Sequence, residues 1–214
     1  ELIHSEFSKK ELRWAKSFLP TLQELEKFIL SNPSKEDIEL IVVGDGEIDR
    51  TLWNIFRLTI HNMQNDTGPG RRMSAVVGFR VRKKFKLLGL ISFQSPSLAL
   101  SVRDEHIGWT DEQRRKYREN IVNLHVCVST QPFGHNFLGG KMLSMMSLDL
   151  VRHWEKKYKN KIVGIETTSL HGSQSQYQSM KWWKHLGTTE GKILLKPLRD
   201  ERSYWRQWLK ENHP

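Results

Sequence analysis

The sequence contains one cysteine in 214 residues, which excludes a framework of intramolecular disulfides. It also lacks an apolar run near the ~20 residues that a membrane-spanning helix needs, and no pattern of a secretory leader opens it. Cys127 lies in an apolar segment that is typical of a strand interior, which favours a buried structural thiol over a nucleophile. We therefore expect a soluble, cytoplasmic protein without a membrane partner.

Metal-binding patterns are missing as well. The histidines, the cysteine and the carboxylates do not follow the spacings of zinc sites, so no metal ligand is predicted. Residues far apart in the sequence could still assemble a weak iron site that leaves no such pattern, and the metal requirement stays open.

Positive charge, in contrast, is abundant. The sequence has 34 Lys and Arg against 24 Asp and Glu, which gives a formal net charge of +10 and a pI near 9.7. Such an excess favours a polyanionic partner, namely DNA or RNA, the phosphates of a coenzyme, or an anionic membrane surface. The alternative is a charge that serves solubility alone.

Large apolar side chains are sufficient for one packed core. Hydrophobic residues make up 37% of the sequence, but they include eight Trp and nine Phe, which bury much surface each. A chain of 214 residues can form a single domain around such a core. We expect a helical extension over residues 1–35 and one domain over 36–214, with an insertion at about 94–118.

The first half of the sequence carries both helical and strand patterns. Apolar residues at helical spacing, interrupted by Pro20, predict two short helices within the first 30 residues. The patterns that follow predict a strand at 38–43, a helix at 52–63, an exposed basic loop at 65–72, a hairpin of strands at 73–82 and 86–93, and a helix at 110–118 with Thr110 and Gln113 as a capping box.

The second half carries a strand, a glycine-containing loop, a helix and a strand in close succession, at 121–128, 129–140, 141–158 and 161–168. This order predicts a βαβ unit with parallel strands. A helix at 176–186, a strand at 192–195 and a closing helix at 199–210 are expected after it. The fold class is therefore α/β or α+β, with a mixed sheet of the acetyltransferase-like (GNAT-like) kind.

In such folds the loop before the helix holds the pyrophosphate of acyl-CoA through backbone amides. The segment from Gln131 to Asn136 matches the coenzyme-loop pattern at its first and fourth positions. We therefore take acyl-CoA as a candidate cofactor, with Gln131, Gly134, Asn136, Gly139 and Gly140 as the candidate binding residues. The alternative is a plain connection that needs glycine for a tight turn.

Several short motifs stand in a characteristic order between Gly89 and Gly191. They are Gly-Leu-Ile-Ser-Phe-Gln-Ser-Pro at 89–96, Arg103-Asp104 with Ile107-Gly108-Trp109, Asn123, Glu166-Thr167, and Trp183-Lys184-His185-Leu186-Gly187 with Thr189. In this order they resemble the DruA-like domain of Druantia anti-phage systems. The resemblance implies a role in defence against phage.

The aromatic segment before Gly187 also resembles that of Mom-like proteins, which modify adenine in phage DNA and have an acetyltransferase-like fold. Here Tyr177 sits one residue further from Trp183, and Lys181-Trp182 replaces an Ala-Asn-like pair. Trp183 also stands where many acetyltransferases have a tyrosine as general acid, and an indole cannot donate an acidic proton. These departures argue against direct transfer of the Mom-type chemistry and against a tyrosine general acid at position 183.

Four polar residues are candidates for catalysis: Asp104, Asn123, Glu166 and Tyr177. A carboxylate at the end of a strand could accept a proton from the attacking nitrogen of a substrate, while an amide and a phenol orient it. We expect these four side chains and Trp109 to converge on one crevice. The alternative is that Asp104 and Glu166 form structural ion pairs.

Cations in predicted loops and beside aromatic residues are candidates for binding nucleic acid, because phosphate contacts and base stacking need these residue types. They are Arg71, Arg72, Arg82, Lys83, Lys84, Lys181 and Lys184, with Trp109 as a stacking residue. Our hypothesis is a GNAT- or Mom-like transferase that modifies DNA bases. The alternative is a DNA-binding module of a phage-defence or counter-defence system that has no catalytic activity.

Overall fold

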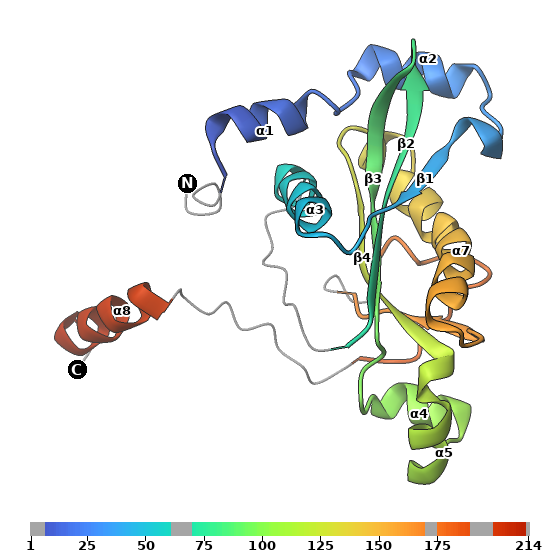
Figure 1. Ribbon diagram of the computed structural model, residues 1–214. Coiled ribbons are helices and arrows are strands. Elements are labelled where there is room, and N and C mark those ends of the chain that lie inside the picture. Colours follow the sequence, from blue (N-terminus) through green and yellow to red (C-terminus); the bar gives the residue numbers. More distant parts are fainter. Residues whose placement is uncertain (1–6, 61–69, 170–174, 189–198, 213–214) are drawn as a thin grey trace.

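The computed structural model describes residues 7–60, 70–169, 175–188 and 199–212 (Figure 1). Its centre is one sheet with the strand order β1-β2-β3-β4-β5. The first three pairs are antiparallel and β4 pairs with β5 in parallel. The strands are β1 (Glu39–Val42), β2 (Arg72–Val81), β3 (Lys84–Gln94), β4 (Ile121–Ser129) and β5 (Gly164–Glu166).

The predicted βαβ unit is confirmed. Helix α7 (Gly139–Tyr158) joins β4 to β5, and Asn123 lies opposite Glu166 in the parallel register. The second strand is shorter than predicted, since β5 has three residues. The mixed α/β class is therefore confirmed.

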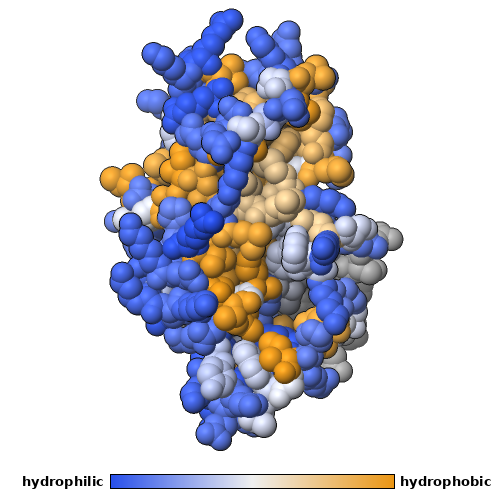
Figure 2. Space-filling model, turned by 90° about the vertical axis from the view of Figure 1, so that its right-hand side faces the viewer, coloured by the Kyte–Doolittle hydropathy of each residue, from blue (hydrophilic) through white to orange (hydrophobic). Residues whose placement is uncertain are grey.

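Two layers of helices cover the sheet. Helix α7 packs on one face, where Leu143, Leu150 and Trp154 contact Ile91 and Phe93. Helix α3 (Glu47–Ile60) packs on the other face, which we call the α3 face (Figure 1). The space-filling view toward α7 shows a hydrophobic band among hydrophilic residues (Figure 2).

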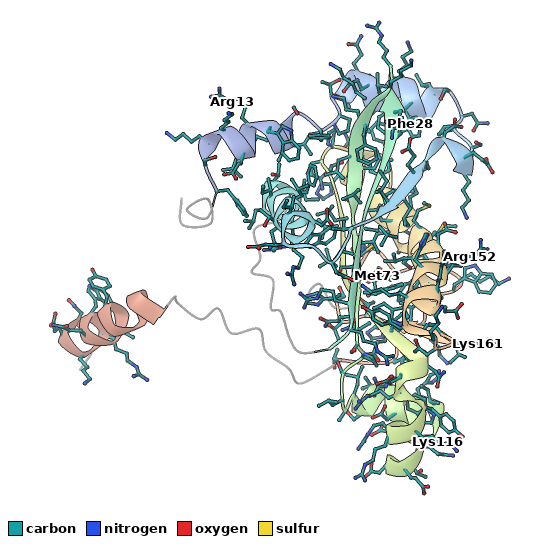
Figure 3. All side chains as sticks on the ribbon, viewed as in Figure 1. Arg13, Phe28, Met73, Lys116, Arg152 and Lys161 are labelled. Carbon is teal, nitrogen blue, oxygen red and sulfur yellow. The ribbon has the colours of Figure 1, made fainter. Side chains whose placement is uncertain are left out.

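The two predicted N-terminal helices are α1 (Lys9–Lys16) and α2 (Leu22–Leu30). Each begins with a capping box, Ser8 with Glu11 and Thr21 with Glu24. They pack against the sheet domain: Phe28 of α2 stacks on Phe79 of β2 with ring centroids 4.2 Å apart (Figure 3). The domain boundary at residue 35 stays a prediction.

Residues 94–118, the predicted insertion, form two short helices at the end of the sheet opposite the β2–β3 turn (Figure 1). Helix α5 (Asp111–Tyr117) starts at the predicted capping box of Thr110 and Gln113. Helix α4 (Ser101–Ile107) was not predicted. The 3₁₀ turns η2 (Lys35–Asp37) and η3 (Arg118–Asn120), helix α6 (Phe133–Asn136) and helix α8 (Arg199–Asn212) complete the described elements.

The helix predicted at 176–186 is wrong. Residues 175–183 form successive tight turns, in which Gln178 N–H donates to Ser175 O and Trp183 N–H to Met180 O. Ser179 has a φ of 64°, which a right-handed helix does not allow. The predicted strand at 192–195 and most of the loop at 65–72 lie outside the described residues, whereas the closing helix is confirmed as α8.

A β-bulge divides β4 into two parts. Phe93 lies opposite Leu124 and Ser92 opposite Val126, so His125 is an extra residue on β4. Val122 and Leu124, before the bulge, pack in the α7 cluster, and so does Cys127 after it. Side-chain alternation is therefore shifted by one residue along this strand.

No helix in the described ranges is both long and apolar enough to cross a membrane.

Candidate nucleic-acid interface

Arg103 of α4 is the centre of a buried ion network. Its side chain is 3% exposed and donates from Nε to Asp104 Oδ1 at 2.7 Å and from Nη1 to Glu166 Oε2 at 2.7 Å. The other oxygen of Glu166 accepts the backbone N–H of Ser97 at 3.0 Å. Both carboxylates thus share one guanidinium group as their buried ion-pair partner.

The same network holds the inserted helices on β5. Arg114 of α5 lies 3.5 Å from Asp104 Oδ2, and the Trp109 ring lies 5.7 Å from the guanidinium carbon of Arg103. The backbone N–H of Trp109 also donates to the backbone carbonyl of Asp104. This is the geometry that a structural ion pair requires. Catalytic roles for Asp104 and Glu166 stay predictions, as does base stacking by Trp109.

A polar row crosses the α3 face of the sheet. Arg72, Gln94, Asn123 and Glu166 lie side by side in register on β2, β3, β4 and β5. They alternate with residues of the α7 cluster such as Met73, Phe93 and Val122, so their side chains leave the sheet on the opposite side. Three strand spacings separate the ends of the row, which is roughly 14 Å.

Tyr177 does not join this row. It packs in the cluster beneath α7, with its ring 4.5 Å from that of Trp183, and its hydroxyl accepts a hydrogen bond from Gln176. Burial is the main cause of a raised pKa at Tyr177. The sheet therefore separates Tyr177 from Asp104, Asn123 and Glu166, and the expected single crevice contains three of the four candidates at most.

The bulge explains this separation. Cys127 of β4, which lies beside Tyr177, packs in the α7 cluster. Without an extra residue in β4, Cys127 would share a face with Asn123, because the two are four residues apart. No sequence pattern that we used reports a bulge.

The candidate coenzyme loop is packed against the protein itself. A Cβ atom at Gly139 would lie 2.9 Å from the Phe133 carbonyl oxygen, and one at Gly140 would lie 3.1 Å from Gln176 Cβ. Gln131 accepts the backbone N–H of His135, and Gly134 and Asn136 lie in helix α6, which was not predicted. Close packing accounts for glycine at 139 and 140, and acyl-CoA binding by this loop stays a prediction.

The predicted nucleic-acid-binding cations lie in three groups rather than in one patch. Arg82 and Lys83 form the β2–β3 turn and Lys84 begins β3, whereas Arg71 and Arg72 lie at the opposite end of β2. Ten residues of strand put about 30 Å between these groups. Lys181 and Lys184 are exposed in the turns beside α7, next to Trp182, which is 78% exposed.

A cleft of about 720 Å³ lies beside the first residues of β2. Strand β1 ends at Val42, so it leaves the edge of β2 open at Arg72. Tyr158 covers this edge: its hydroxyl accepts from Arg72 N–H and donates to Arg72 O. The polar lining is Asp45, Arg50, Asn54, Arg71, Arg72, Ser74 and Lys157.

Two of these cations, Arg50 and Lys157, were not predicted from the sequence. They come from α3 and α7, which lie on opposite faces of the sheet, and only the folded chain brings them together. The spacing of Arg50, Trp53 and Asn54 places all three on one side of α3, which is the signal that could have identified Arg50. No comparable pattern marks Lys157.

Within the described ranges no group of three or more His, Cys, Asp or Glu side chains could hold a metal ion.

The amino-acid sequence is similar to that of one family of known proteins. The sequence pattern of the family described as "Druantia protein DruA" matches residues 4–197. Druantia protein DruA of Escherichia coli (strain UMEA 4076-1) is 29% identical over 191 residues, which cover 78% of this chain and 46% of that protein. The chain thus spans less than half the length of this relative. No solved structure matches the chain. The match over 4–197 covers most of the sequence, and the chain belongs to the Druantia DruA family.

Proposed function

We propose that this chain is a nucleic-acid-binding component of an anti-phage defence system. The defence role rests on the family, and the binding role rests on exposed positive charge. Arg82, Lys83, Lys84, Lys181 and Lys184 are all exposed, and none of them forms an ion pair with another described residue. Exposed cations without protein partners remain available to phosphate groups.

Counterion release gives a direct test of this proposal. Binding of a fluorescent oligonucleotide should weaken steeply as salt rises, with a slope of about 0.7 per phosphate contact for single strands and about 0.9 for duplexes. Replacing Arg82, Lys83 and Lys84 together by Gln should lower that slope. The matched control replaces Lys9, Lys10 and Lys16 of α1 by Gln, which removes the same charge from another exposed surface.

The proposal fails if the unaltered chain does not bind at low salt or if its binding does not respond to salt. If the hairpin and control variants weaken binding equally, the charge acts without a defined surface, and the hairpin is not the binding element.

A DNA-modifying transferase is a second candidate. The parallel β4–β5 pair joined by α7 favours it, because acetyltransferase-like folds have this arrangement at their coenzyme site. In that case acyl-CoA would supply the transferred group, and Asp104, Asn123, Glu166 and Tyr177 are the candidate catalytic residues.

Mass spectrometry of nucleosides from cells that express the chain tests this second candidate. A modified nucleoside that disappears in a folded Glu166→Gln variant would support it. If the DNA of expressing cells carries no modification, the binding module without catalytic activity is the better assignment.

A further inference from the structure

We propose that the cleft beside β2 is a second binding site and that it takes the phosphodiester backbone of nucleic acid. This inference rests on the proposed nucleic-acid binding and assigns a site that the exposed hairpin and turn cations do not include. The cleft is lined by four cations, Arg50, Arg71, Arg72 and Lys157, and by one carboxylate, Asp45. Its size lies within the range of ordinary ligand sites.

Two of these cations have no ion-pair partner among the described residues. Arg50 is exposed on α3, and the half-buried Arg72 begins the polar row of the α3 face. Arg71 is paired with Glu119 at 2.8 Å, on the side of the insertion. Arg50 and Arg72 therefore provide positive charge that no described carboxylate pairs with at the cleft.

The Tyr158 ring fixes the position of the other two cations. The guanidinium carbon of Arg71 lies 5.3 Å from its centroid and Lys157 Nζ lies 5.1 Å from it. Because the Tyr158 hydroxyl is held by the backbone of Arg72, the ring cannot turn away without loss of two hydrogen bonds. The cations are thus arranged before a ligand arrives, which lowers the entropic cost of binding.

The carboxylate of Asp45 occupies the position in the cleft that we assign to a phosphate group. Its Oδ1 accepts from Lys157 Nζ at 2.7 Å, although the Asp45 side chain is 74% exposed. Burial lowers the pKa of Lys157, but hydrogen bonds to Asp45 and Tyr158 outweigh it, so the pKa is raised and the amine stays charged. A phosphate group can replace Asp45 at little cost, because the released carboxylate is already largely hydrated.

The cleft borders the polar row of the α3 face. Arg72 and Ser74 belong both to its lining and to the α3 face, where Gln94 and Asn123 follow in the polar row. Asn123 is buried and Gln94 is half-buried, so Gln94 is the amide that a strand extending from the cleft would meet, and it can donate to and accept from sugars and bases.

The test measures binding of a single-stranded oligonucleotide by fluorescence anisotropy across a salt series. Arg50→Gln should weaken binding about 3- to 10-fold at low salt and reduce the salt slope by about 0.7, the loss of one phosphate contact. Asp45→Asn should strengthen binding by a similar factor and increase the slope, because Lys157 is then free for phosphate. A loss of stability would weaken binding in both variants, so opposite effects of Arg50→Gln and Asp45→Asn on affinity cannot arise from it.

Arg13→Gln is the matched control, since Arg13 is an exposed arginine of α1 away from the cleft (Figure 3). It should leave both the affinity and the slope nearly unchanged. If the unaltered chain binds in a salt-dependent way but Arg50→Gln and Asp45→Asn behave like Arg13→Gln, the cleft is not the site and the proposed function stands. If the unaltered chain does not bind at all, both proposals fail together.

Discussion

Tyr158, the last residue of α7, satisfies an open sheet edge with a single hydroxyl group. Tyr158→Phe removes both of its hydrogen bonds to Arg72 and keeps the ring, so it should lower the free energy of unfolding by about 1–2 kcal/mol. Urea denaturation measures this loss. Tyr117→Phe is the control, because the Tyr117 ring is exposed and contacts Lys116 only through its face. Equal losses in the two variants would contradict the assignment.

Glu166 contributes to stability through Arg103. Glu166→Gln leaves the guanidinium without one of its two buried carboxylates and should cost about 3 kcal/mol of unfolding free energy. The control is Asp111→Asn, which breaks the exposed pair with Arg114 and should cost less than about 0.5 kcal/mol. Thermal unfolding of both variants makes the comparison. A stable Glu166→Gln protein would remove the structural explanation for this carboxylate.

Part of the candidate site was accessible from the sequence. Asp104, Asn123 and Glu166 are polar residues next to apolar strand or helix patterns, and such residues stand out in a linear reading. Tyr177 was expected in the same crevice but packs on the α7 side with Cys127, and the bulge that turns Cys127 to that side leaves no residue signature. Arg50 and Lys157 were missed because their proximity depends on how two helices end near one strand edge.

At the scale of elements, α7 is fixed to the sheet by one of its sides only. Leu150 is fully buried in the central cluster, whereas Leu148 is 58% exposed on the outer side of the same helix. Leu150→Ala should therefore cost about 2–5 kcal/mol of unfolding free energy, and Leu148→Ala should cost less than about 0.5 kcal/mol. Chemical denaturation of this matched pair checks the orientation of α7. Equal losses would indicate that Leu148 is covered in solution.

Elements with long, regular patterns were predicted well. The strands β2, β3 and β4 and the helix α7 each have nine or more residues, and their bounds differ from the prediction by at most two residues. Helix α4 has seven residues, which are too few for a periodic pattern to show. It ends at Gly108, which has a left-handed conformation. The turns at 175–183 have helical composition, but packing of Tyr177 on Trp183 fixes them in another form.

At the scale of the whole molecule, Cys127 provides a probe of unfolding. Burial raises the pKa of its thiol to about 12, so at pH 8 roughly one part in ten thousand is the reactive thiolate. The pKa of Cys127 in the folded chain lies above the usual thiol value. A larger fraction of the thiol is therefore deprotonated in the unfolded chain, which reacts faster at pH 8. The Cys127 side chain is half-buried, and iodoacetamide should label the native protein much more slowly than the denatured protein. Equal labelling rates in native and denaturing buffer would contradict the raised pKa of Cys127.

The extra residue in β4 reverses the alternation of side chains between the two faces of the sheet. Asn123 and Cys127 are four positions apart, which would place them on the same face of a regular strand, yet they face opposite sides of the sheet because His125 is inserted between them. If this strand gained or lost one residue, the side chains beyond that point would move to the opposite face of the sheet without any substitution. An alignment that pairs relatives position by position through β4 would transfer roles to the wrong side of the sheet wherever a relative lacks this residue.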